Sequence, residues 1–167
     1  MRNSHRILTM STQPVLAPGD KAPTFTLDDE TGAKKSLSDF AGKKLIIFVY
    51  PAAMTPGCTT EACDFRDSAS SLIAAGYQVV GLSPDPVESL AKFKERDHLS
   101  YPLLSDPSKE TLKAYGAFGE KKNYGKIVQG VIRSTFIIDE SGNVIDALYN
   151  VKATGHVARI RKLVGLD

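Results

Sequence analysis

The chain has 167 residues, of which 42% are hydrophobic and 24% charged, and its formal net charge is +2. Length and composition are those of one ordinary globular domain. No apolar run reaches the roughly 18 residues of a transmembrane helix, and no basic stripe is present, so we expect neither a membrane nor a nucleic-acid partner.

The first sixteen residues contain Arg2 and Arg6 but no acidic residue. This composition has a weak likeness to a transit peptide, but we interpret it as a disordered tail, or as an extension upstream of Met10 as the natural initiator. The segment lacks the apolar core of a secretion signal, so a cytoplasmic protein is predicted. We therefore expect a tail over residues 1–16 and a single domain over residues 17–167.

Six strands are predicted from short alternating or continuous apolar runs. In chain order they cover residues 24–27, 45–50, 78–82, 101–104, 134–138 and 144–151. The run at 45–50 is apolar throughout, which is typical of a central strand buried on both faces. The segment 140–143 between the last two strands is typical of a hairpin turn, and we expect 118–126 to be a basic loop.

Helices are predicted between these strands from cap and proline signals. A helical turn at 38–42 ends at glycine, and the cysteine-bearing segment forms a helix that ends near Gly76. Three further helices are expected to begin at Asp85-Pro86 (with Glu88 at the capping-box position), at Asp106-Pro107 and at Thr154. The order β-α-β-α-β-α-β-β-α indicates an α/β fold, a central mixed sheet with helices on both faces and a late antiparallel hairpin at one edge.

Both cysteines lie in the 50–67 stretch Y-P-A-A-M-T-P-G-C-T-T-E-A-C-D-F-R-D. Thr55 followed by Pro56 is typical of an N-cap residue and the first position of a helix. Cys58 is then the third residue of the helix, where free backbone N–H groups and the helix dipole stabilise a thiolate. We therefore expect Cys58 to be reactive.

Cys63 follows Cys58 by five residues. In an ideal helix this spacing gives about 500° of rotation and about 7.5 Å of rise, so the two Cα atoms lie roughly 8.6 Å apart. A disulfide requires less than about 7 Å. The helix must therefore unwind before the two cysteines can bond, which suits a catalytic pair better than a structural disulfide.

A helical wheel predicts different surroundings for the two sulfurs, because Cys63 falls about 140° away from Cys58. The residues within about 60° of Cys58 that form an inward-facing stripe are Ala62, Phe65, Ala69, Leu72 and Ile73. We expect the Cys58 sulfur to be partly shielded on this side of the helix.

Other polar residues admit simpler interpretations. Arg133 lies in an apolar run, and an exposed edge-strand arginine in a surface salt bridge is its simplest interpretation. Glu61 is interpreted as a solvated first-turn acid, with a role in tuning the cysteine site left open, and His98 and His156 as partners of helix dipoles. Arg66 and Asp67 are expected to form surface salt bridges on the cysteine helix, with a supporting role for the site left open. No C-x-x-C is present and the histidines lie far from the cysteines, so no zinc site is predicted.

The pattern P-x-x-x-T-x-x-C, formed by Pro51, Thr55 and Cys58, resembles the active-site signature of peroxiredoxins. The C-x-x-x-x-C spacing followed by F-R-D resembles their bacterioferritin-comigratory-protein (BCP)/PrxQ subfamily. The similarity runs from about Pro18 to the C-terminus and includes P-L-L-S-D, Y-G-K and R-S-T-F-I-I-D.

This resemblance implies a thioredoxin-like fold and the reduction of hydrogen peroxide and organic hydroperoxides. It makes Cys58 the peroxidatic cysteine, oxidised to a sulfenic acid, and Cys63 the resolving cysteine of an intramolecular disulfide. Thr55 and Arg133 then match the positions that orient peroxide and stabilise the thiolate, and Pro51 matches the shielding proline. For Arg133 the resemblance reverses the surface interpretation.

The resemblance further implies a thioredoxin-type reductant and no metal, haem or flavin cofactor. The chain has no C-terminal cysteine that could act on a partner subunit, so a mostly monomeric protein is expected. Two alternatives remain open: a thiol–disulfide oxidoreductase on the same fold, which would lack its usual C-x-x-C, and a non-catalytic domain with two core cysteines.

Overall fold

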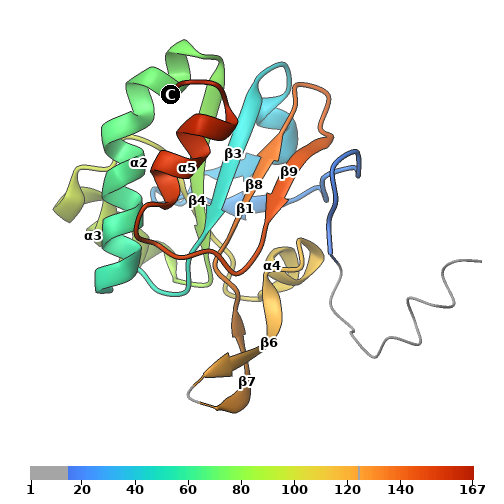
Figure 1. Cartoon of the computed structure of the whole chain (residues 1–167). Coiled ribbons are helices and arrows are strands. Elements are labelled where there is room, and N and C mark those ends of the chain that lie inside the picture. Colours follow the sequence, from blue (N-terminus) through green and yellow to red (C-terminus); the bar gives the residue numbers. More distant parts are fainter. Residues whose placement is uncertain (1–14, 124) are drawn as a thin grey trace, which may run out of the picture.

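The computed structural model describes residues 15–123 and 125–167 as a central β-sheet covered by helices, with a separate two-stranded ribbon (Figure 1). The strands of the sheet are β1 (Thr26–Asp28), β2 (Lys34–Ser36), β3 (Lys44–Val49), β4 (Tyr77–Ser83), β5 (Leu103–Ser105), β8 (Ser134–Ile138) and β9 (Val144–Leu148). The ribbon consists of β6 (Phe118–Asn123) and β7 (Lys126–Val131). The helices are the 3-10 helix η1 (Leu37–Phe40), α2 (Pro56–Ala74), α3 (Val87–Asp97), α4 (Glu110–Ala114) and α5 (His156–Leu163).

The sheet is mixed, with the strand order β2-β1-β5-β4-β3-β8-β9. The central strand β3 pairs in parallel with β4, where Ile47 lies opposite Val80, and antiparallel with β8, where Ile47 lies opposite Phe136. The hairpin β8–β9 forms one edge of the sheet, as predicted, and β2 is an edge strand that the sequence patterns did not indicate. The predicted α/β class with a central mixed sheet is confirmed.

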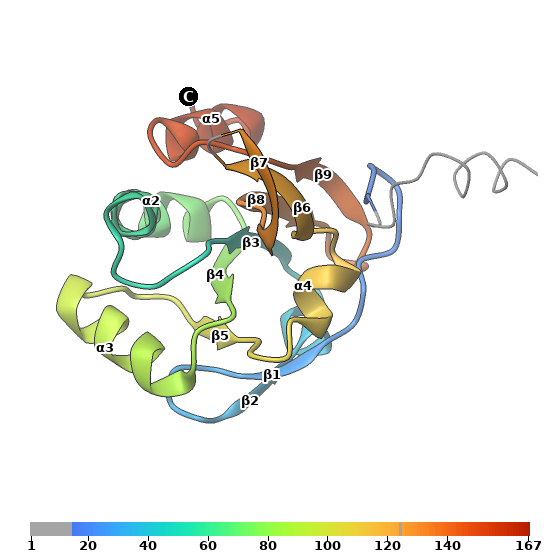
Figure 2. The same ribbon diagram turned by 90° about the horizontal axis from the view of Figure 1, so that it is seen from below.

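Two apolar clusters cover the two faces of the sheet. Alternate residues of β3 enter different clusters, Ile46 and Phe48 on one face and Leu45 and Ile47 on the other, because successive side chains of a strand point to opposite faces. Helices α2, α3 and α5 contribute buried residues to the first cluster, and α4 contributes to the second. Figure 2 shows α2 between α5 and α3, with α4 on the other side of the sheet. The central strand is buried on both faces, as predicted.

The cysteine helix packs largely along the predicted stripe. Ala62, Phe65, Ala69 and Leu72 are buried, whereas Ile73 is 56% exposed. The prediction for Ile73 is therefore wrong. It lies in the last turn of α2, next to the exposed residues that lead to Gly76.

Three predicted helix starts are displaced along the chain. Helix α3 has Pro86 as its N-cap residue, and no side-chain cap comes from Asp85. Helix α4 begins later than predicted, because the carboxylate of Asp106 accepts the N–H of Leu112 across the preceding turn. Helix α5 has Gly155 rather than Thr154 at its N-cap.

The predicted basic loop at 118–126 is instead most of the antiparallel ribbon β6–β7, which extends from the body of the molecule (Figure 1). Its lysine-rich composition obscures the strand pattern, yet every residue of β6 has an antiparallel partner in β7. Lys121 donates a hydrogen bond to the main-chain oxygen of Val131 at 2.7 Å. The ribbon leads directly into the residues that precede β8.

The predicted tail, residues 1–16, lies outside the described residues except for Val15 and Leu16. The N–H of Leu16 donates to the hydroxyl of Tyr149 at 2.9 Å. Within residues 15–123 and 125–167, no helix has both the length and the apolar character to cross a membrane.

Candidate active site

Cys58 lies in the first turn of α2, beyond the carboxyl end of β3. Thr55 is the N-cap residue, with φ −80° and ψ 158°, and Pro56 occupies the first helical position, as predicted. The connecting loop contains Met54 at φ +67°, a left-handed conformation that costs a residue with a side chain on the order of 1 kcal/mol. Cys58 is only 1% exposed, so its sulfur lies at a helix N-terminus in a largely water-free setting.

A guanidinium contacts this sulfur. Arg133 connects β7 and β8, and its Nη2 lies 3.2 Å from the Sγ of Cys58. Burial alone would lower the pKa of Arg133, but the neighbouring Cys58 and Glu61 outweigh burial and raise it. Arg133 is therefore a permanent cation bonded to the sulfur of Cys58. The surface interpretation of Arg133 is wrong.

Glu61 completes this cluster. Its Oε1 accepts a hydrogen bond from Nη1 of Arg133 at 2.6 Å, and its side chain is fully buried. Burial raises the pKa of Glu61 to about 7, against the opposing influence of Arg133. The interpretation of Glu61 as a solvated acid is therefore wrong. A signal was available, because a three-residue spacing puts Glu61 about 60° from Cys58 on the helical wheel.

The loop before α2 is fixed by a residue from the adjacent parallel strand. Asp85 follows β4, and its Oδ2 accepts from the N–H of Ala53 at 2.7 Å and from the hydroxyl of Ser83 at 2.8 Å. The carboxylate predicted to cap α3 therefore holds the loop of the cysteine site. Parallel strands bring their carboxyl ends to the same edge, which explains how residues from β3 and β4 meet there.

Two further predicted site residues, Thr55 and Pro51, lie in the same loop. Thr55 is exposed, and its hydroxyl donates to the main-chain oxygen of Ala52 at 2.8 Å. Pro51 is half-buried directly after the buried Tyr50. Ala53 and Met54 are partly buried and pack against the apolar cluster that includes Cys58. The loop that precedes the cysteine is thus partly apolar.

Cys63 lies one turn further along α2 and is a free thiol, like Cys58. It is only partly buried, and burial raises its pKa, with a smaller opposing influence from Arg66. Both cysteines lie within the uninterrupted helix Pro56–Ala74, so the ideal-helix separation of roughly 8.6 Å applies. The predicted difference between the two sulfur environments is confirmed.

His156 and Arg66 are two further residues whose interpretation from the sequence is tested by the structure. His156 is buried and lies 2.7 Å from the hydroxyl of Thr135, and burial lowers its pKa to about 4. It is therefore neutral, and its interpretation as a dipole partner is wrong. Arg66 pairs with Asp67, as predicted, and it also donates to the main-chain oxygen of Asp97.

Among residues 15–123 and 125–167, no group of three or more histidine, cysteine or acidic side chains could hold a metal ion. The site consists instead of a buried sulfur at a helix N-terminus, a guanidinium bonded to that sulfur, and a second thiol on the same helix. This arrangement defines a thiol-based redox enzyme.

Comparison with known proteins identifies the family. Residues 18–147 match the model of the AhpC/TSA family, and the chain belongs to this family. The Mycobacterium tuberculosis protein Rv2521, which carries a peroxiredoxin name, is 58% identical over 147 residues, covering 88% of this chain and 94% of the relative. Peroxiredoxin Bcp of Bacillus subtilis is 44% identical over 140 residues, covering 84% of this chain and 89% of the relative.

Solved structures agree with this assignment. Peroxiredoxin Q of Xanthomonas campestris superposes with a TM-score of 0.81 at 32% identity, covering 92% of this chain and 97% of that chain. The thioredoxin-like fold of the peroxiredoxin type is therefore confirmed. The chain is a peroxiredoxin of the Bcp/Q group, a thiol-dependent peroxidase.

Proposed function

We propose that Cys58 is the peroxidatic residue of this peroxidase. The observation that carries the proposal is the 3.2 Å contact between its buried sulfur and Nη2 of Arg133, at the N-terminus of α2. The thiolate attacks one peroxide oxygen, the O–O bond breaks, and the departing oxygen takes a proton to leave as water or an alcohol. Cys58 becomes a sulfenic acid.

Arg133 and Thr55 are proposed to stabilise the transition state of the attack of Cys58 on the peroxide. The guanidinium has donors that can reach both the sulfur and a peroxide oxygen as negative charge moves between them. The Thr55 hydroxyl already donates to Ala52, so it retains lone pairs that can accept the hydrogen of a hydroperoxide. Pro51, at the end of the strand, limits the access of water to the sulfur.

We propose that Cys63 resolves the sulfenic acid. Its thiolate attacks the Cys58 sulfur, an S–S bond forms, and the hydroxyl of the sulfenic acid leaves as water together with the thiol proton. Because both cysteines lie in one continuous helix, this step requires local unwinding of α2. A thioredoxin-type dithiol then reduces the disulfide and becomes oxidised itself.

The proposed substrates are hydrogen peroxide and organic hydroperoxides. Partly buried Ala53 and Met54 next to the cysteine loop offer apolar contact for an alkyl chain. A solved structure of the Xanthomonas campestris bacterioferritin comigratory protein is described in terms of alkyl peroxide reduction activity, which supports this range. We further propose a cytoplasmic, mostly monomeric enzyme with no metal, haem or flavin, built as one domain over residues 17–167 after an N-terminal tail.

A stopped-flow titration with mass detection tests these roles. Cys58→Ser should abolish peroxide consumption, whereas Cys63→Ser should consume one equivalent and accumulate a sulfenic acid on Cys58. With thioredoxin as reductant, Cys63→Ser should lose most steady-state turnover. Retained turnover in Cys58→Ser would refute the peroxidatic assignment, and wild-type turnover in Cys63→Ser would refute the resolving assignment.

A further inference from the structure

Residues 96–101 bond to α2 in and just after the turn between the two cysteines, whereas Glu61 in the same turn bonds to Arg133. Three hydrogen bonds join the 96–101 segment to α2: Arg96 Nη2 to Thr59 Oγ1 at 2.8 Å, the Tyr101 hydroxyl to Ala62 O at 2.6 Å, and Arg66 Nη1 to Asp97 O at 2.7 Å. Their partners on α2 lie one residue after Cys58, one before Cys63 and three after Cys63. The bonds therefore span the part of the helix that must unwind before the cysteines can join.

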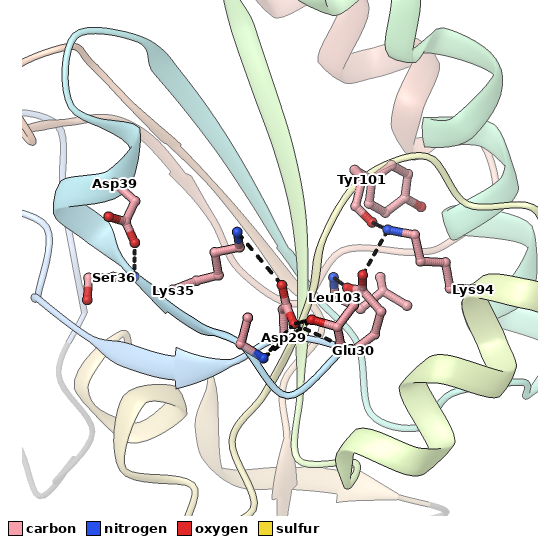
Figure 3. Close-up of polar contacts among 10 residues, drawn as sticks. Asp29, Glu30, Lys35, Ser36, Asp39, Lys94, Tyr101 and Leu103 are labelled. Atoms are coloured by element: carbon pink, nitrogen blue, oxygen red, sulfur yellow. Dashed lines mark hydrogen bonds and ion pairs between the residues drawn. The ribbon is translucent and has the colours of Figure 1, made fainter.

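Tyr101 is itself firmly held. It is only 4% exposed, and its ring packs edge-on against Phe48 with a centroid separation of 5.6 Å. Lys94 donates to its main-chain oxygen at 3.2 Å and to Glu30 at 3.0 Å, as Figure 3 shows. Glu30 in turn accepts the N–H of Leu103 in β5. The hydroxyl that reaches α2 thus projects from a part of the molecule that is fixed to the sheet.

We propose that Arg96 and Tyr101 are positioning residues that hold the 59–62 turn helical and thereby slow formation of the Cys58–Cys63 disulfide. The inference rests on the resolving role proposed for Cys63. Both side chains bond to α2 only while the turn is helical, because unwinding moves Thr59 and the Ala62 carbonyl away from their donors. Among residues 15–123 and 125–167, neither side chain hydrogen-bonds to the sulfur of Cys58, so the attack on peroxide is expected to be independent of them.

The delay has a chemical consequence. While Cys58 remains a sulfenic acid in the helical state, a second peroxide can oxidise it to a sulfinic acid, releasing one water or alcohol. Disulfide formation and this second oxidation compete for the same sulfenic acid. The 96–101 segment therefore sets the peroxide concentration at which the enzyme is inactivated.

Tyr101→Phe tests the proposal because it removes the hydroxyl and keeps the ring. In stopped-flow experiments, we expect disulfide formation about fivefold faster than in wild type, the factor for one hydrogen bond. The peroxide concentration that converts half of Cys58 to sulfinic acid, measured by mass, should rise by a similar factor. The rate constant of peroxide attack should not change.

Tyr115→Phe is the matched control. Tyr115 is also fully buried, and its hydroxyl also donates to a main-chain oxygen, that of Pro23 at 2.7 Å, but on the other face of the sheet. Arg96→Gln supplies a second, independent test, and it should accelerate disulfide formation while leaving the attack unchanged.

Each outcome decides the matter. Unchanged disulfide formation in both Tyr101→Phe and Arg96→Gln overturns the positioning role while leaving the resolving role intact. Equal acceleration in Tyr115→Phe, or a parallel change in the attack rate, shows general loosening and also overturns it. If wild type forms no Cys58–Cys63 disulfide at all, the proposed resolving role fails, and the inference fails with it.

Discussion

Helix α2 has different neighbours on its two sides, and the two sides carry different functions. On the side of β8 and α5, Arg133 bonds to Cys58 in the first turn and to Glu61, which lies between the cysteines. On the side of α3, Arg96 and Tyr101 bond to the following turn, between the cysteines. Figures 1 and 2 show α2 lying between α5 and α3. We therefore infer that the β8 side mainly determines the chemistry at the sulfur, and that the α3 side mainly controls the change in helix conformation.

The largest decrease in the rate of peroxide attack is expected when the guanidinium of Arg133 is removed. Arg133→Ala should lower the rate constant of peroxide attack by about 100-fold, the cost of losing one preorganised donor in a site of this kind. Disulfide formation from a sulfenic acid, once formed, should change less than the attack, because the bonds from Arg96 and Tyr101 to α2 remain. Both constants are measurable by stopped-flow fluorescence and thiol loss.

Arg159→Ala is the matched control for this prediction. Arg159 is an exposed arginine on α5, and the control should retain the wild-type rate of attack. An Arg133→Ala protein that attacks peroxide within threefold of the wild-type rate would contradict the division between the two sides of α2.

A smaller decrease in the rate of peroxide attack is expected when Glu61 is replaced, because Glu61 acts through Arg133. Glu61→Leu removes the acceptor that orients the guanidinium, so peroxide attack should slow by about tenfold. Glu61→Gln retains an oxygen that can accept from Nη1 of Arg133, so the loss should be only about threefold. Stopped-flow peroxide consumption distinguishes the two variants. Equal rates in Glu61→Leu and wild type would show that the 2.6 Å contact between Arg133 and Glu61 does not position the guanidinium.

The two sides also differ in how far the sequence could predict them. The helix start at Pro56 and the depth of Cys58 follow from local rules, a cap residue followed by proline and a helical wheel. The contact between Arg133 and Cys58 joins residues 75 positions apart, and it exists only because β8 pairs with β3. Local patterns do not contain that pairing, and for Arg133 they favoured the wrong interpretation until the family resemblance reversed it.

The α3 side was missed for a similar reason. Tyr101 was predicted as part of a short strand, and nothing in its neighbourhood indicates that its hydroxyl reaches Ala62, 39 residues earlier. Asp85 is predicted to cap the helix that follows it, but its partner is the loop of the cysteine site. Polar residues at strand ends bond to whichever loop the sheet brings near, so their partners depend on topology.

The smallest expected effect is a change in the pH dependence of the free energy of unfolding, caused by His156 on the β8 side. Burial lowers the pKa of His156 to about 4 from 6.5, and Arg159 and Arg133 add to this effect. Below about pH 6.5, the unfolded chain therefore binds more protons at His156 than the native protein does. The contribution of neutral His156 to the free energy of unfolding is present above that pH and is lost as pH falls towards about 4. Compared with His156→Gln, wild type should lose on the order of 1 kcal/mol of unfolding free energy between about pH 7.5 and about pH 4.5.

Chemical denaturation at a series of pH values measures this difference. Glu61 has the opposite dependence, since burial raises its pKa to about 7 and the native protein binds more protons there than the unfolded chain. Both proteins contain Glu61, so its contribution cancels in the comparison. A constant difference between wild type and His156→Gln across this range would mean that His156 is as accessible to protons in the native protein as in the unfolded chain, which its packing against Phe65 and Thr135 argues against.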